Sequence, residues 1–224
     1  PLTKALEHAD SLPIEQQQRV EAALARVTAN LRLRLFRASL PEEDRKLLDG
    51  YVERQRALCE DLFTDDSQMR IAALHRIPLA PDSAAGVLVA AKVGDSDFDV
   101  VEEALAAAEE LRDEVVARGL IRVVEEAMRF IETADVPPVD RLAYGVVYAE
   151  LTRKIARIVG LAKYREGAAT IQKAIAFFDQ PATSSVFQPG VALEALGQTG
   201  DESAVPLLLR YLDSREISTV RYLE

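Results

Sequence analysis

The chain has 224 residues, of which 49% are hydrophobic and 29% charged, and its formal net charge is −10. This length and apolar content suit one continuous repeat array or one to two globular domains. The negative charge argues against nucleic-acid binding, which depends on Lys and Arg displacing counterions. The sequence has no apolar run of about 18 residues and no signal-peptide pattern at its N-terminus, so we expect a soluble, cytoplasmic protein without a membrane partner.

Helical periodicity and capping residues divide the chain into helices with few interruptions. A long helix follows Pro13 and runs to about residue 37. Ser39-Leu40-Pro41-Glu42 has the pattern of a capping box, which predicts a second helix to about residue 63. These two helices make a predicted N-terminal pair over residues 1–64.

The rest of the chain shows the same pattern of acidic or small polar residues before apolar, helix-period segments. The expected helices begin after Asp65–Ser67, Asp82 or Ser83, Asp95 or Ser96, Asp113 and Pro137-Pro138, with a further helix to about Phe178, a loop at 180–188 and a final pair over 192–213. No segment alternates with period two over several residues, and aromatic residues are only 6% of the chain. The sequence therefore predicts an all-α fold.

Residues 192–213, ALEALGQTGDESAVPLLLRYLD, form the most informative stretch. They predict a helix, a turn in which Gly200 takes a positive φ, and a second helix capped by Asp201. The stretches at 65–77, 95–111 and 213–223 each begin with Asp and continue with aliphatic and small residues, as the first helix of such a pair would. Neither helix of a pair can bury its apolar face alone, so neighbouring pairs should stack against it.

These segments resemble HEAT-like repeats of the phycobilin-lyase type, most closely over 192–213. The resemblance implies a right-handed α–α superhelix, a HEAT-like or armadillo-like solenoid, over residues 65–224. Residues 1–64 and 137–180 match no repeat motif, and a helical bundle is the alternative for them. The segment 213–223 would be the first helix of a further unit, so we expect the array to continue beyond residue 224 or to bury this end against another copy. The helices at 82–93, 114–132 and 202–212 would be the second helices of their units.

Residues with catalytic or metal-binding chemistry are few. The chain has two histidines, His8 and His75, and one cysteine, Cys59, without the spacing of a metal site. HEAT-like hydroxylases that hold iron with repeated His-Glu pairs do not match, because the order here is Glu7-His8 and His75-Arg76. HEAT-like DNA glycosylases need a basic surface with aromatic residues, and this chain is acidic and lacks Trp. We therefore expect no metal, no cofactor and no catalytic residue.

Charge is unevenly distributed along the chain. Residues 65–132 carry 15 Asp and Glu against 7 Lys and Arg, whereas 19–37 carry five Arg against one Glu. Such segregation either steers a charged partner or reflects solvated helix faces. The arginine-rich helix is expected to pack with Leu24, Val27, Leu31 and Leu35 inward, and the alternative is that it lies on an anionic membrane.

The helix over 114–132 has one apolar stripe and, on the opposite side, a charged stripe. The charged stripe consists of Arg118, Arg122, Glu125 and Arg129. Second helices line the concave surface of HEAT solenoids, so these four residues are the candidate partner-binding strip. The alternative interpretation is pairing within the helix, such as Arg122 with Glu125 or Glu126.

The helix over 138–160 carries Tyr144, Tyr148, Leu151 and Ile155 along one face, which predicts a buried seam instead of a ligand-stacking platform. Its basic residues, Arg153, Lys154 and Arg157, point elsewhere. They should be solvated, meet an acidic partner, or meet the acidic 65–132 region of the same chain.

The function expected from these patterns is a non-catalytic scaffold or adaptor that binds a protein or peptide along the solenoid. The alternative, which the lyase resemblance suggests, is an enzyme or enzyme subunit acting on a chromophore or a modified residue. Nucleic-acid binding is third and is disfavoured by charge.

Overall fold

The computed structural model describes residues 13–78 and 82–213, and within them it is helical without a strand. The α-helices are α2 (Ile14–Ser39), α3 (Glu42–Arg54), α4 (Arg56–Leu62), α5 (Ser67–Arg76), α6 (Ser83–Lys92), α7 (Phe98–Leu111), α8 (Glu114–Thr133), α9 (Pro138–Leu161), α10 (Ala168–Phe178), α11 (Ser184–Phe187), α12 (Pro189–Thr199) and α13 (Val205–Asp213). Two short 3-10 helices, η1 (Arg165–Gly167) and η2 (Glu202–Ala204), precede α10 and α13. The prediction of an all-α fold is confirmed for the described residues.

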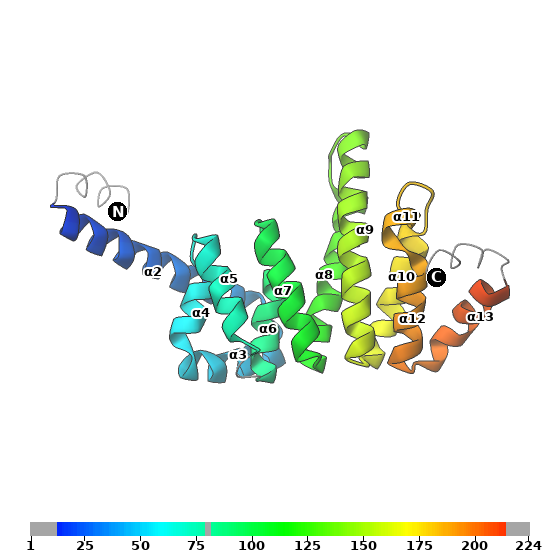
Figure 1. Cartoon of the computed structure of the whole chain (residues 1–224), viewed down its shortest axis with the longest axis horizontal. Helices are drawn as coiled ribbons and strands as arrows, with labels where there is room; N and C mark the ends of the chain where they lie inside the picture. The colour runs from blue at the N-terminus through cyan, green and yellow to red at the C-terminus, as the bar shows by residue number, and fades with distance from the viewer. Residues whose placement is uncertain (1–12, 79–81, 214–224) are drawn as a thin grey trace.

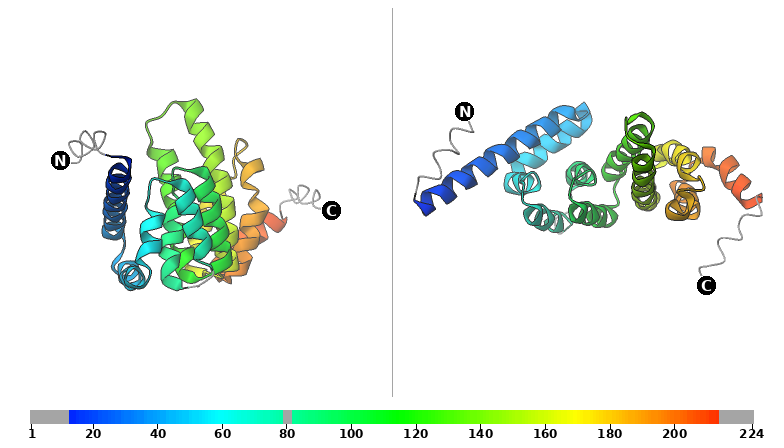
Figure 2. Two further views of the ribbon diagram at one scale, coloured as in Figure 1. Left: turned by 60° about the vertical axis from the view of Figure 1, so that its left-hand side comes forward. Right: turned by 90° about the horizontal axis from the view of Figure 1, so that it is seen from above.

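Eight of the helices from α3 onward are arranged in two rows. One row contains α5, α7, α9 and α12, and the other contains α3, α6, α8 and α10, with each helix packed on the next in its row. Helices that follow one another in the chain, such as α6 and α7 or α8 and α9, pack across the rows. The view from above in Figure 2 shows the two staggered rows, and Figure 1 shows the elongated body that they form. Apolar side chains from both rows meet in one continuous core.

Most of the predicted helix starts are confirmed because a carboxylate caps the first free N–H groups. Asp66 accepts from the N–H groups of Gln68 and Met69, Asp82 from Ala84, and Asp113 from Val116. The C-terminal pair also has the expected turn, since Gly200 ends α12 with φ 69° and Asp201 accepts from the Ser203 N–H.

Three predicted boundaries in the first half of the chain were wrong in detail, and the predicted loop at 180–188 contains the short helix α11. The side chain of Ser39 donates to the carbonyl of Phe36 and does not cap α3, so the expected capping box is absent. The second helix is broken at Gln55 into α3 and α4. Asp97 caps α7, because the side chain of Asp95 is used in the contacts between loops described below.

The orientation of α2 also differs from the expectation. Ala29 and Leu33 are its buried residues, whereas Val27, Leu31 and Leu35 are 57%, 55% and 63% exposed. Polar contacts stabilise this orientation of α2. Asn30 donates to Glu60 at 3.1 Å, and Arg32 pairs with Asp65 at 2.6 Å. The C-terminal part of α2 thereby packs on α3 and α4, while its outer side keeps an apolar stripe.

The expected further unit at 213–223 lies almost entirely outside the described residues, and so does His8. The last described helix, α13, exposes Val205, Leu209 and Leu212. No helix in the described ranges is both long enough and apolar enough to cross a membrane.

Close packing between α6 and α8 depends on glycine. A Cβ atom at Gly86 would lie 2.7 Å from Val116 Cγ2 and 2.9 Å from the Val116 backbone nitrogen. Gly119 on α8 likewise faces Ala90 on α6. The small residues therefore let the two backbones approach within a distance that any side chain would prevent.

We expect Gly86→Ala to lower the free energy of unfolding by about 1–3 kcal/mol, because the added methyl group forces the helices apart. Gly197 on α12 is the matched control, since nothing lies within 4 Å of its added Cβ. There the same change should raise stability by about 0.5–1 kcal/mol through helix propensity. Urea denaturation measures both, and an increase in stability for Gly86→Ala would contradict the close-packing argument.

Candidate functional site

An open groove lies between α7, α8 and α9, and its volume is about 690 Å³. Its apolar walls come from all three helices. They are formed by Phe98 and Val101 of α7, Val123, Ala127 and Phe130 of α8, and Tyr144, Val147, Tyr148 and Leu151 of α9. Several of these side chains are open to solvent, with Phe98 68% and Val147 58% exposed. The groove is therefore an accessible apolar surface.

The groove exists because α9 is longer than α7. Helix α9 has 24 residues and α7 has 14, so the N-terminal part of α9 extends past α7 at the top of Figure 1. The predicted seam is correct at Ile155, which is 1% exposed, but wrong at Tyr144, which is 41% exposed. Phe130 packs edge to face on Tyr144 and Tyr148, with centroid distances of 5.3 and 5.7 Å. These three rings form an aromatic wall, of which the sequence analysis had assigned Tyr144 and Tyr148 to the buried seam.

Charged side chains stand along the groove. Lys154 of α9 donates to both carboxylate oxygens of Glu102 on α7 at 2.7 Å, which ties the two walls together. Below it, Arg157 pairs with Glu109 at 2.9 Å. The sequence analysis gave three possible surroundings for the basic residues of α9. For Lys154 and Arg157, the acidic region of the same chain is the correct one. Glu126 and Arg129 also line the groove and make no ion pair with another described residue.

The four residues of the predicted strip lie in three different surroundings. Arg118 and Arg122 each bind one oxygen of Asp44 on α3, both at 2.5 Å. Glu125 accepts from Thr170 on α10 at 2.8 Å, and Arg129 lies at the groove. The predicted pairing of Arg122 within its own helix is therefore wrong, because Arg122 pairs with Asp44 of α3. The role of the strip in partner binding stays a prediction, and Arg129 is the member best placed for it.

Asp44 is a residue that the sequence analysis missed. It is 2% exposed and belongs to the first turn of α3, where an acidic residue looks like an ordinary favourable partner of the helix dipole. Nothing in the sequence distinguishes it from its neighbours Glu42 and Glu43, which remain exposed. Its structural role is to join α3 to α8 through two charge-assisted hydrogen bonds.

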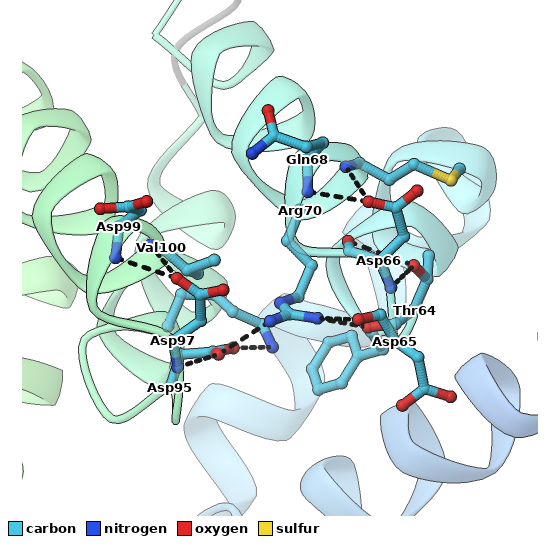
Figure 3. A network of polar contacts seen from close by, with 12 residues as sticks. Thr64, Asp65, Asp66, Gln68, Arg70, Asp95, Asp97, Asp99 and Val100 are labelled. Carbon is cyan, nitrogen blue, oxygen red and sulfur yellow. Dashed lines mark hydrogen bonds and ion pairs between the residues drawn. The ribbon is translucent and has the colours of Figure 1, made fainter.

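A second buried charge cluster joins the loops beside the groove (Figure 3). Asp95 follows α6 and accepts from Arg70 of α5 and from Lys92 of α6, each at 3.1 Å. The side chains of all three are at most 10% exposed. Arg70 also donates to the carbonyl groups of Thr64 and Asp65 at 2.8 and 2.9 Å. The cluster therefore fixes the loop between α4 and α5 against the loop between α6 and α7.

The electrostatics of this cluster favour an ionised Asp95. Burial alone would raise the pKa of Asp95, but the hydrogen bond from the Asp97 N–H and the charges of Lys92 and Arg70 outweigh it, so the pKa lies below its ordinary value of 3.8. Burial lowers the pKa of Lys92, against the opposing effect of Asp95. Lys92 also lies over the Phe63 ring, 4.5 Å from its centroid.

The cluster and the groove share a wall. Gly94, Asp95 and Ser96 line both the apolar groove and a smaller polar hollow of about 360 Å³ next to Arg32, Arg70 and Lys92. The position of this loop therefore depends on the ion pairs of Asp95. We infer that the cluster holds this wall of the groove in place.

The remaining reactive side chains are engaged or buried. His75 contacts Glu103 through its Nε2 atom at 2.7 Å, on the surface between α5 and α7. Burial raises the pKa of the Cys59 thiol to about 12, so it is not a thiolate at neutral pH. Within residues 13–78 and 82–213, no three His, Cys, Asp or Glu side chains converge as metal ligands would.

Comparisons with protein-family models, with curated proteins and with solved structures find no match for this chain. The HEAT-like resemblance therefore stays an expectation based on the repeated pairs in the sequence.

Proposed function

We propose that the chain is an α–α superhelix of HEAT-like repeats that acts as a non-catalytic scaffold, and that its groove between α7, α8 and α9 binds a helical segment of a protein partner. The two rows of helices, each packed on the next, support the superhelix. The observation that carries the function is the groove itself, whose apolar and aromatic walls are exposed while charged residues stand along its edges.

An amphipathic helix fits these features because its apolar face can cover Phe130, Tyr144 and Val147 while its polar flanks meet Glu126 and Arg129. Such helices anchor through residues at i, i+3 or i+4, and i+7. Apolar walls with a few charged residues are also the usual composition of a binding interface, with the apolar part at its centre. The two ionic residues without a partner in the described chain are then available to set the orientation of the bound helix.

The test is a selection of amphipathic helical peptides displayed on phage against the full chain, followed by titration of the recovered peptides. A Trp placed on the apolar face of the peptide reports binding without background, because the chain has no Trp. We expect Val147→Glu to weaken binding at least about tenfold, since it puts a charge on an apolar contact. Val139→Glu on the same helix is the control, because Val139 is 72% exposed and lies outside the groove.

Equal loss of binding for both variants, or recovery of no peptide that distinguishes them, would contradict the proposal. Circular dichroism of both variants shows that the fold is retained, which we expect because both positions are exposed.

The second candidate is that the groove holds a planar apolar small molecule, as the lyase resemblance suggests. Its volume of about 690 Å³ and its aromatic wall favour this alternative. Small-molecule pockets commonly have volumes of roughly 300–1,000 Å³. Saturable binding of a tetrapyrrole to the wild-type chain, lost in Val147→Glu and kept in Val139→Glu, would favour it over the scaffold.

A further inference from the structure

The smaller polar hollow beside the groove has an excess of positive charge in its lining. Three cations line it, Arg32 of α2, Arg70 of α5 and Lys92 of α6, together with the two carboxylates of Asp65 and Asp95. One positive charge is therefore in excess, although the chain as a whole has a net charge of −10. At physiological ionic strength the screening length is about 8 Å, so these nearby charges outweigh the distant ones.

The excess charge lies in the buried part of the lining (Figure 3). Arg70 and Lys92 share the single carboxylate of Asp95, and all three side chains are at most 10% exposed. A buried charge without a counterion is costly, because the protein interior solvates it less well than water does. The Nε atom of Arg70 also has no hydrogen-bond acceptor among the described residues. A bound anion would supply the negative charge that this cluster lacks.

The surroundings of Lys92 agree with an incomplete counter-charge. Burial lowers the pKa of Lys92 most, and the charges of Arg70 and Arg32 lower it further, so the ion pair with Asp95 does not compensate for them. Two cations also meet at Phe63, since Arg32 donates to its carbonyl at 3.4 Å and Lys92 Nζ lies 4.5 Å from its ring centroid. An anion beside Arg32 and Lys92 would replace their mutual repulsion by attraction to a shared partner.

The outer side of the hollow has contacts that can be exchanged. Arg32 pairs with Asp65 at 2.6 Å, but the two side chains are 45% and 75% exposed. Ion pairs this exposed contribute little to stability, so an anion with better geometry can replace Asp65. Ser96 also lines the hollow and is exposed, and neither its N–H nor its hydroxyl group donates to another described residue. Uncommitted donors are therefore present next to the cations.

We propose that the hollow binds a phosphate group, held by Arg32, Lys92 and the N–H and hydroxyl groups of Ser96. When Asp65 turns to solvent, three cations remain against Asp95, and this excess of two charges matches a phosphate group, which carries about −1.5 to −2 at pH 7. The planar fork of Arg suits phosphate oxygens, and Lys adds a compact charge. The volume of about 360 Å³ also admits part of a molecule that carries the phosphate. The inference goes beyond the proposed function, since this site needs no helix in the groove.

The experiment is a titration of the full chain with sodium phosphate at constant ionic strength and pH 7, followed by NMR of the backbone amides. The amide signals of Gly94, Asp95 and Ser96 should shift with saturation, with a dissociation constant of about 1 mM or tighter. Sodium acetate and sodium chloride at the same ionic strength should give no saturable shift, because each anion carries a single charge.

A second titration distinguishes the two sources of a phosphate group. Its probe is phosphoserine with an acetylated amino group and an amidated carboxyl group, which has no other charge. Tighter binding of this probe than of inorganic phosphate assigns the site to a phosphate group on a larger ligand. Equal or weaker binding assigns it to the free ion.

Two substitutions should change phosphate binding in opposite directions. Arg32→Gln should weaken it at least about tenfold, because it removes a cation from the open side of the hollow. Asp65→Asn should strengthen it about threefold, because it removes the exposed carboxylate that competes for Arg32. Arg37→Gln is the matched control, since Arg37 lies on the same helix, is 46% exposed and pairs with Asp49 outside the hollow.

The altered side chains are exposed, so the variants should keep the fold, and circular dichroism verifies this. The absence of a saturable shift at residues 94–96 with both phosphate probes would overturn the inference. Acetate that binds as tightly as phosphate, or equal affinities of Arg32→Gln and Arg37→Gln for phosphate, would overturn it as well. Binding of helical peptides in the groove is measured separately, so none of these outcomes affects the proposed function.

Discussion

Replacement of Asp95 by alanine should lower the free energy of unfolding by about 3–5 kcal/mol, because it leaves two buried cations without their carboxylate. Arg70 and Lys92 are only 9% and 10% exposed in their side chains, so little water reaches their charges in the folded protein. For a chain of this length the loss corresponds to a fall of about 2–4 °C in melting temperature per kcal/mol. Urea denaturation followed by circular dichroism measures it.

Two neighbouring carboxylates are the controls. Asp97→Ala removes only the cap of α7 and should cost about 1 kcal/mol. Asp99→Ala changes an exposed side chain and should stay within about 0.5 kcal/mol of the wild type. Similar effects at all three positions would contradict the importance of the buried cluster.

The same carboxylate gives an expected pH dependence. Because the pKa of Asp95 is lowered in the folded protein, its stabilising contribution is complete above the ordinary value of 3.8 and is lost as the pH falls through the folded value. The difference in unfolding free energy between the wild type and Asp95→Asn should therefore be largest near neutral pH and should shrink in acid. A difference that does not change with pH would contradict an ionised Asp95.

Replacement of Asp44 by alanine should cost about 2–4 kcal/mol, since it removes the partner of both Arg118 and Arg122. The loss should be smaller than for Asp95, because these two side chains are 21% and 33% exposed and water can reach their charges. Thermal and urea unfolding of the purified variant provide the measurement.

Glu43→Ala is the matched control, one residue away. Glu43 is 61% exposed in its side chain and lies 3.5 Å from Arg118, so its removal should change stability by about 0.5 kcal/mol at most. If both variants unfold at the same urea concentration, the joint between α3 and α8 does not depend on Asp44.

Features set by local contacts were predictable from the sequence. The caps at Asp66, Asp82 and Asp113 and the turn at Gly200 each need only neighbouring N–H groups or a positive φ. Asp95 and Asp97 are both close enough to cap α7, and the choice between them depends on Arg70, which comes from α5. Similarly, Arg122 finds its partner 78 residues away, where no periodicity within a helix can indicate it.

Helix α2 and the groove were missed for a related reason. The periodicity of α2 contains two apolar faces, and the sequence favoured the face with the larger side chains, Val27, Leu31 and Leu35. The contacts of Asn30 and Arg32 with Glu60 and Asp65 instead turn the face with Ala29 and Leu33 inward. The groove depends on how far α9 extends past α7, which no pattern within either helix reveals.

The most direct test of the central claim, that the groove binds a helical protein segment, is the fluorescence of a single Trp placed in its wall. Phe130→Trp introduces the only Trp of the chain at a position that is 38% exposed, and Val205→Trp on α13 provides a distant reference. A selected helical peptide without Trp should shift the emission of Phe130→Trp to shorter wavelength, with saturation, because the indole becomes buried. The emission of Val205→Trp should not change. A peptide that binds without shifting Phe130→Trp, or that shifts only Val205→Trp, would contradict the claim.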